Sequence, residues 1–267
     1  KLVRQAMLKA KELDVPLSFH EEDPAFISEN GIHAGEAAKA LGIQGSPALA
    51  EDALVARDCM LALHTGASVN IQHISSANSV RMVKLAKELG ADVTAEVTPH
   101  HFTLTESAVL EHGAMAKMNP PLRTEKDRLG IIEGIRDGSI DMIATDHAPH
   151  SAAEKEKGLS GSAMGIVGLE TAFPVLYTKL VRTGVMTFEK LIQMMAVRPR
   201  EIFDLPVGEI VPGAPADLCL LDTDCNWTVD PDKFLTMGRA TPFAGWQVQG
   251  KNRLTVWRGE VVYEALR

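Results

Sequence analysis

The chain has 267 residues, 45% of them hydrophobic, and a formal net charge of −8. This size allows a sizeable core in one large and one small domain, and the acidic balance argues against a nucleic-acid-binding or membrane-binding surface. Three cysteines without a CxxC pair, no membrane-length apolar run and no visible secretory signal favour a cytoplasmic protein with reduced thiols.

Strand-like and helix-like segments alternate up to about residue 204. We expect helices at 2–13, 46–66, 77–89, 124–136, 166–182 and 187–203, and strands at 15–20, 69–73, 92–98 and 140–145. Ser76 and the segment from Thr124 to Asp127 have residue types typical of helix N-caps, and Gly90 is a typical helix end. Alternation of this kind predicts an α/β fold with a parallel sheet.

The pattern changes after about Asp204. Short strand-like runs at 211–222 and 253–264 lie between turn signals, and a hairpin is expected at Gly259-Glu260. We therefore expect an α/β domain at 1–204 and part of a small β domain at 205–267.

Three potential metal ligands come at the ends of predicted strands. His20 ends the first strand, His73 ends the second, and Asp146 follows the fourth. The carboxyl ends of parallel strands meet at one edge, where catalytic residues gather in α/β barrels. Two imidazoles and a carboxylate form a ligand set for a divalent metal ion, most naturally zinc. A lone histidine at a strand end is more often structural, so the prediction depends on the three together.

Three further histidines have simpler interpretations. We expect a structural role for His147, whose side chain should point away from that of Asp146. We expect His100 and His101 to belong to a local polar network at the same edge.

The number of strands is lower than a closed barrel requires. Four strand–helix units are visible in the sequence. A closed barrel of this type has eight, and four parallel strands alone would leave a long unpaired edge. We therefore expect roughly 120 or more residues before Lys1, at ~30 residues for each absent unit.

Six segments carry a family resemblance. They are SFHEED around His20, NIQHISS around His73, KMNPPLR around Asn119, ATDHAPH around Asp146, GIVGLET from Gly165 and PGAPADL from Pro212. Together, and in this order, they resemble class I dihydroorotases, which are cyclic amidohydrolases of pyrimidine synthesis. The resemblance implies a TIM-type (β/α)8 barrel, of which these are the last four strand–helix units, with a flanking β-sandwich.

The resemblance also implies roles for individual residues. His20 and His73 would bind one zinc ion of a binuclear pair, and Asp146 would contact the other ion and act as the catalytic base. The loop at 151–163 is typical of a lid. The residues that would bind the substrate, dihydroorotate or carbamoyl aspartate, are Asn119, His150, Met164 and Gly165.

Two other functions fit the same residues. One is that of a related cyclic amidohydrolase, such as an allantoinase or hydantoinase. The other is that of a non-catalytic scaffold for aspartate carbamoyltransferase, although every ligand expected in this span is present. We expect a homo-oligomer, and aspartate carbamoyltransferase is a candidate partner.

Overall fold

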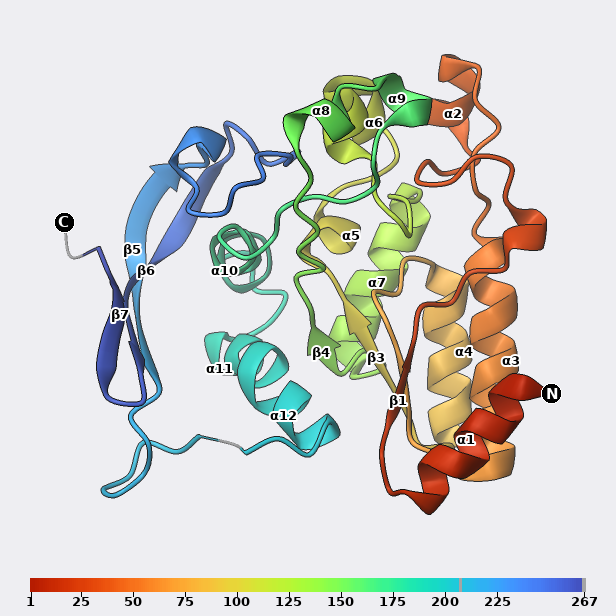
Figure 1. Ribbon diagram of the computed structural model, residues 1–267, viewed down its shortest axis with the longest axis horizontal. Helices are drawn as coiled ribbons and strands as arrows, with labels where there is room; N and C mark the ends of the chain where they lie inside the picture. The colour runs from red at the N-terminus through yellow and green to blue at the C-terminus, as the bar shows by residue number, and fades with distance from the viewer. Residues whose placement is uncertain (207, 266–267) are drawn as a thin grey trace. The chain divides into compact units, whose positions relative to one another are not determined.

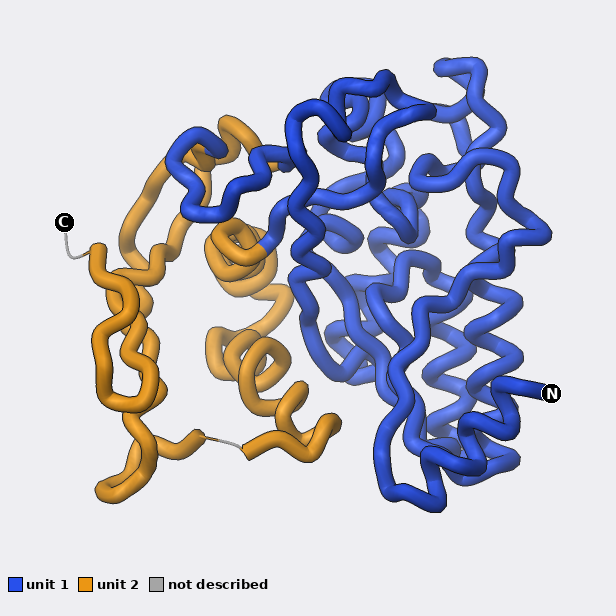
Figure 2. Tube along the Cα trace, in the orientation of Figure 1, with its two compact units in different colours: residues 1–168, 231–242 blue, residues 169–230, 243–267 orange. Residues whose placement is uncertain are grey.

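A computed structural model describes residues 1–206 and 208–265, which form two compact units (Figure 2). Unit 1 comprises residues 1–168 and 231–242, and unit 2 comprises residues 169–230 and 243–267. No helix among the described residues is both long and apolar enough to cross a membrane. The division into domains at residue 204 remains a prediction.

Unit 1 contains a four-stranded parallel sheet in the order β1-β2-β3-β4. The predicted parallel sheet is therefore confirmed, while a closed barrel remains a prediction. The strands are shorter than expected, because the backbone leaves the ladder before His73 (φ 33°) and Asp146 (φ 47°). Their bounds are Leu17–Phe19 for β1, Val69–Ile71 for β2, Val93–Val97 for β3 and Met142–Ile143 for β4.

Three long helices of unit 1 pack side by side along the sheet (Figure 1). They are α3 (Leu49–Thr65), α4 (Ala77–Glu88) and α7 (Glu125–Asp137), and α1 (Leu2–Glu12) packs on α3. The predicted caps are present: Ser76 accepts a hydrogen bond from the amide of Asn78, and Thr124 forms a capping box with Asp127. A Cβ on Gly134 of α7 would lie 2.6 Å from a methyl group of α4, so this glycine permits the close approach of the two helices.

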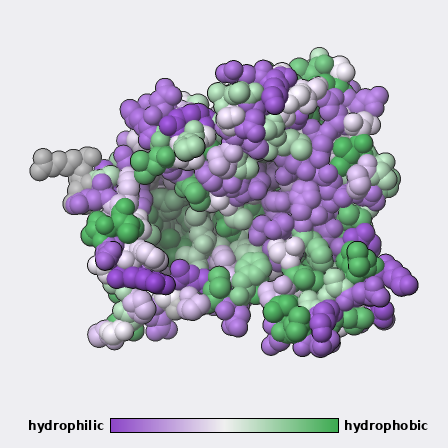
Figure 3. Space-filling model, in the orientation of Figure 1, coloured by the Kyte–Doolittle hydropathy of each residue, from purple (hydrophilic) through white to green (hydrophobic). Residues whose placement is uncertain are grey.

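Short helices occupy the loops of unit 1 that follow β1, β3 and β4, and one further short helix, η5, lies in the segment of unit 1 that follows β5 in the chain. Hydrophilic side chains cover much of the region around α8 and α9 (Figure 3). The bounds of these helices are η1 Pro24–Phe26, α2 Glu36–Leu41, α5 Pro99–Thr103, α6 Ala108–His112, η2 Gly113–Ala116, α8 Ala152–Lys155, α9 Gly158–Gly161 and η5 Pro231–Lys233.

Unit 2 consists of short helices and an antiparallel sheet in the order β5-β6-β7. The first predicted helix begins at Ala172 rather than near 166. The hairpin loop between β6 and β7 is Arg258-Gly259, one residue earlier than predicted, and both residues have positive φ, as tight hairpin turns require. The bounds are α10 Ala172–Leu176, η3 Tyr177–Val181, α11 Phe188–Ile192, η4 Gln193–Val197, α12 Arg198–Ile202, β5 Leu218–Thr228, β6 Gln247–Trp257 and β7 Glu260–Glu264.

Candidate functional site

The structure brings His20 and His73 together beyond the carboxyl ends of β1 and β2. Nδ1 of His20 lies 3.0 Å from Nε2 of His73, and the two rings meet edge to face at 76°. Two nitrogens bound to one tetrahedral zinc ion, each at ~2.0–2.1 Å, are about 3.3 Å apart. The spacing of these two rings therefore fits a shared zinc ion.

The surroundings of His73 keep its ring neutral. Burial, and then the charge of His20, lower the pKa of His73 to about 4. Its Nδ1 is buried and has no hydrogen-bond partner within the described part of the chain. A neutral imidazole is the form that binds a metal ion, so this ring is suited to ligation near neutral pH.

A polar layer lies in the sheet below the two histidines. The side-chain amide of Asn70 on β2 donates hydrogen bonds to Oγ of Ser18 on β1 (2.9 Å) and to Oε2 of Glu96 on β3 (3.3 Å). Its Oδ1 accepts a hydrogen bond from Thr94 at 3.2 Å. The other oxygen of Glu96 accepts a hydrogen bond from the backbone amide of His73 at 3.3 Å. The layer therefore connects three strands to the backbone of a candidate ligand.

Asp146 lies in the segment after β4 and is half-buried. Burial raises the pKa of its carboxyl group, and the charge of His20 acts in the opposite direction. Within the described residues, no three His, Cys, Asp or Glu side chains are grouped closely enough to hold one metal ion. The structure thus joins His20 with His73 but does not add Asp146 to them, and its predicted role as a metal ligand and base stays a prediction.

Asn119 reaches the histidine pair through Glu22, which was not predicted as a site residue. The side-chain amide of Asn119 donates a hydrogen bond to Oε2 of Glu22 and lies 3.4 Å from Nε2 of His20. The same carboxylate contacts Nε2 of His20 at 3.3 Å and accepts a hydrogen bond from Asn30. Burial favours the neutral form of Glu22, but the hydrogen bonds from Asn119, Asn30 and His20 prevail and lower its pKa. The sequence feature that could have identified Glu22 as a site residue is the run His20-Glu-Glu-Asp directly after a predicted strand.

The other predicted substrate-binding residues lie together. Nε2 of His150 is 2.9 Å from the carbonyl oxygen of Met164. Gly165 has φ +135°, and a Cβ there would lie 2.5 Å from Cβ of Ala148 and 3.1 Å from Nε2 of His150. The amide of Gly165 donates a hydrogen bond to the carbonyl of Lys117, two residues before Asn119. The segments that carry these residues are therefore connected.

A buried ion pair supports the loops that carry the site. Glu51 of α3 accepts hydrogen bonds from the amides of Ser75 and Ser76, just after His73, at 3.0 and 3.1 Å. Arg123 donates to Oγ of Ser75 at 3.0 Å, and its Nη2 lies 3.8 Å from Glu51. Both charged side chains are almost fully buried. This pair connects the loop after β2 to the segment that follows Asn119.

Two of the remaining histidines, His147 and His101, have the local partners expected of structural residues, whereas Nε2 of His100 is buried without a hydrogen-bond partner in the described part of the chain. Nδ1 of His147 accepts a hydrogen bond from the amide of Gly168 at 3.0 Å. His101 contacts Oγ1 of Thr98 at 2.8 Å and the carbonyl oxygen of Pro120 at 2.9 Å, which confirms the local network for this residue.

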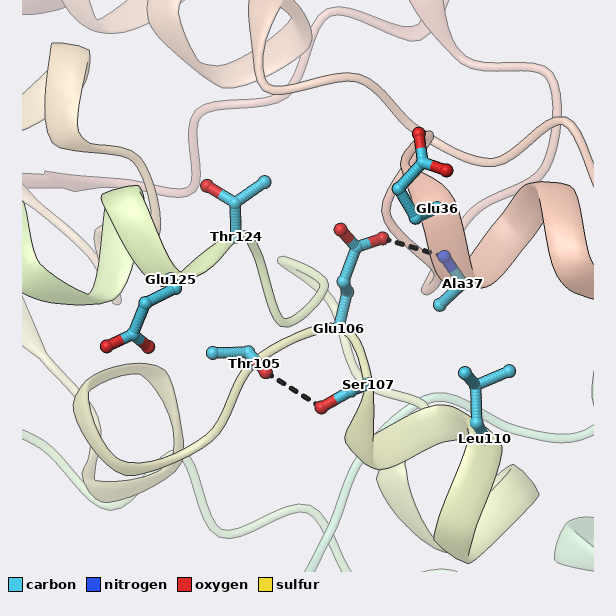
Figure 4. Close-up of a pocket in the computed structure, with 8 residues that line it drawn as sticks. All are labelled: Glu36, Ala37, Thr105, Glu106, Ser107, Leu110, Thr124 and Glu125. Atoms are coloured by element: carbon cyan, nitrogen blue, oxygen red, sulfur yellow. Dashed lines mark hydrogen bonds between the residues drawn. The ribbon is translucent and has the colours of Figure 1, made fainter.

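A pocket of about 270 Å³ lies beside the N-terminal ends of α2 and α7 (Figure 4). One of its three carboxylates, Glu106, accepts a hydrogen bond from the amide of Ala37. None of the predicted site residues lines this pocket, and its carboxylates disfavour an anionic ligand. The lining residues are Glu36, Ala37, Thr105, Glu106, Ser107, Leu110, Thr124 and Glu125.

Comparisons with known proteins agree with these features. Residues 1–262 match the Amidohydrolase family. The chain is 51% identical to a dihydroorotase of Clostridioides difficile over 264 residues, which are 99% of this chain and 62% of that protein. A dihydroorotase of Clostridium acetobutylicum is 45% identical, with the same coverage. The chain thus spans about 62% of the length of these relatives.

Solved structures show the same fold. An L-hydantoinase from Arthrobacter aurescens superposes with a TM-score of 0.88 at 26% identity, over 98% of this chain and 60% of that one. A D-hydantoinase from a Thermus species gives a TM-score of 0.86 at 23% identity, over 98% of this chain and 60% of that one. The parallel sheet and the small antiparallel sheet therefore form an α/β fold of the kind found in these enzymes.

Proposed function

The chain belongs to the amidohydrolase family, and from this premise we propose that it carries zinc-binding and substrate-binding residues of a dihydroorotase. The reaction is the reversible hydrolysis of the cyclic amide of dihydroorotate to carbamoyl aspartate, in pyrimidine synthesis. The observation that carries the proposal is the close pair His20–His73, in a chain whose relatives bear that name. The (β/α)8 barrel, with residues 1–204 in it and residues 205–267 in a β-sandwich, belongs to the same proposal.

His20 and His73 would hold one zinc ion, and Asp146 would contact a second. Zinc, when bound, lowers the pKa of water to about 7 and polarises the amide carbonyl group. The carboxylate of Asp146 would accept the proton of the attacking water and deliver it to the departing amide nitrogen. Burial raises the pKa of this carboxyl group, which makes its carboxylate a stronger base for the first transfer.

The substrate would be oriented by the connected segments around Asn119 and Gly165. The Asn119 amide would pair with the ring amide of dihydroorotate, and His150 would donate to its carboxylate. Gly165 would allow the backbone at Met164 to approach the ring closely. The contact between Nε2 of His150 and the Met164 carbonyl supports this arrangement, because it holds the imidazole against the same segment.

A hydantoinase-type activity is the second candidate, because the fold neighbours with TM-scores of 0.86–0.88 are hydantoinases. Hydrolysis of hydantoin or allantoin without hydrolysis of dihydroorotate would favour this candidate. A non-catalytic scaffold for aspartate carbamoyltransferase would bind that enzyme and hydrolyse none of these compounds. Homo-oligomerisation and a cytoplasmic location belong to the first proposal and are tested by the mass of the assembly and by cell fractionation.

The test combines zinc analysis with dihydroorotate hydrolysis, both measured on the complete protein that contains this chain. We expect His73→Ala to lose zinc and turnover together. His112→Ala is the matched control, because His112 lies on α6 outside the site, and it should keep both. Full zinc content and turnover in His73→Ala would refute the assignment of the metal site.

A further inference from the structure

Two buried lysines fasten the loop that ends at Met164 and Gly165. The ammonium group of Lys155 donates hydrogen bonds to the carbonyl oxygens of Ala163 (2.8 Å), Gly165 (3.0 Å) and Lys117 (3.4 Å). The ammonium group of Lys117 donates in return to the carbonyls of Ser160 (2.9 Å) and Ser162 (3.1 Å). The two side chains are 2% and 3% exposed, respectively. The loop predicted as a lid is therefore held at both its middle and its end.

The acceptors of both ammonium groups are neutral. In the portion of the chain that the structure describes, neither lysine forms an ion pair, and the charge that favours protonated Lys117 is that of Glu29. Burial, and then the charge of Lys117, lower the pKa of Lys155 to about 8. Burying a cation without a carboxylate is unfavourable. Both ammonium groups are therefore held by carbonyl oxygens, and each brings a buried positive charge to this loop.

This charge lies next to the candidate substrate-binding residues. The carbonyls of Lys117 and Gly165 belong to the segments that carry Asn119 and Met164, and the Gly165 amide also donates to the Lys117 carbonyl. His150 contacts the Met164 carbonyl in the same loop. Movement of the Lys155 ammonium group would therefore displace the backbone at both segments, and movement of the Lys117 ammonium group would displace the loop at Ser160 and Ser162.

We propose that Lys117 and Lys155 form a two-lysine clamp that positions the segments around Asn119 and Gly165 and makes the site selective for a substrate bearing a carboxylate. The clamp acts through the backbone and through its charge, so both lysines are positioning residues. This inference rests on the proposed function, since dihydroorotate is an anion and its product carries two carboxylates. Hydantoins without an acidic substituent are neutral and would gain nothing from the charge.

The decisive variant is Lys155→Met, which removes the charge and the donors and keeps most of the length of the side chain. Lys157→Met is the matched control, because Lys157 is exposed in the same loop. The probes are orotate, an anion, and uracil, the same ring without the carboxylate, tested as competitive ligands of the zinc-loaded complete protein. We expect Lys155→Met to weaken orotate binding about tenfold, to change uracil binding by less than about twofold, and to leave the zinc content unchanged.

Backbone positioning has its own measurement, which does not depend on catalysis. Hydrogen exchange of the amides at 158–165, followed by mass spectrometry, should accelerate at least about tenfold in Lys155→Met and not in Lys157→Met. If Lys155→Met does not fold, Lys117→Met is judged by the same criteria. Unchanged exchange, or equal weakening of orotate and uracil, would overturn the clamp. Absence of dihydroorotate hydrolysis in the unmodified protein would instead refute the proposed function, and the exchange result would still decide the positioning role.

Discussion

Breaking the buried pair Glu51–Arg123 should destabilise the protein strongly and non-additively. In Glu51→Gln, one side-chain oxygen must replace two that accept hydrogen bonds from Ser75 and Ser76, and the charge 3.8 Å from Arg123 is lost. Loss of one partner of a buried ion pair costs about 3–5 kcal/mol in the free energy of unfolding. We expect a cost in this range for Glu51→Gln and for Arg123→Met.

The double variant decides whether the pair is coupled. The double variant contains neither charge, so no buried charge lacks its partner. We therefore expect its loss of unfolding free energy to be smaller than the sum of the two single losses by about 1–3 kcal/mol. The assay is urea-induced unfolding followed by circular dichroism at 222 nm. The exposed pair Glu36–Lys39, at 2.6 Å, is the matched control and should show coupling of less than about 0.5 kcal/mol. Additive costs for Glu51 and Arg123 would refute the reasoning.

Three further substitutions test other parts of unit 1. Gly165 has φ +135°, and the Cβ introduced by Gly165→Ala would lie 2.5 Å from that of Ala148. The KM for dihydroorotate should therefore rise at least about tenfold while the zinc content stays the same. An unchanged KM would contradict this prediction. Burial, and then a hydrogen bond with Asp58, raise the pKa of Glu21 from 4.5 to about 8. Between pH 4.5 and about pH 8, Glu21 is therefore protonated in the folded protein and ionised in the unfolded protein. Stability should therefore fall as pH rises from about 5 to 8, by at most about 1.4 kcal/mol per unit from this group, and Glu21→Gln should flatten the dependence in urea unfolding measured at each pH. Gly134→Ala should destabilise the packing of α7 on α4 by about 1–3 kcal/mol in the same assay, and a stabilised variant would show that the helices separate readily.

Local features of the fold were predictable, whereas long-range partners were not. Ser76 and the Thr124–Asp127 capping box are read from a few adjacent residues, and both form as expected. The positions of His20 and His73 followed from the rule that parallel strands end at one edge. Glu22 could be placed at a strand end but not beside Asn119, because that contact spans 97 residues.

The buried pair Glu51–Arg123 shows the same limit. Glu51 lies in the first turn of a helix, where an acidic residue is ordinarily explained by the helix dipole. Its partners come from loops after other strands, and no local pattern connects them. The predicted end of β4 was also wrong, because the apolar run continues to Ala144, one residue after the strand has ended.

The polar layer of Ser18, Asn70, Thr94 and Glu96 makes strand alignment a determinant of the spacing between the candidate ligands His20 and His73. Side chains alternate between the faces of a strand, so a slip of one residue between β1 and β2 would turn Asn70 away from its partners on both neighbouring strands. The same slip would change the height of His73 relative to His20 by one residue. A single-residue insertion or deletion in β2 would therefore change the distance between His20 and His73, even though both residues are still present. Under the proposed function, the length of the core strands therefore constrains the metal site as directly as the identity of its ligands does.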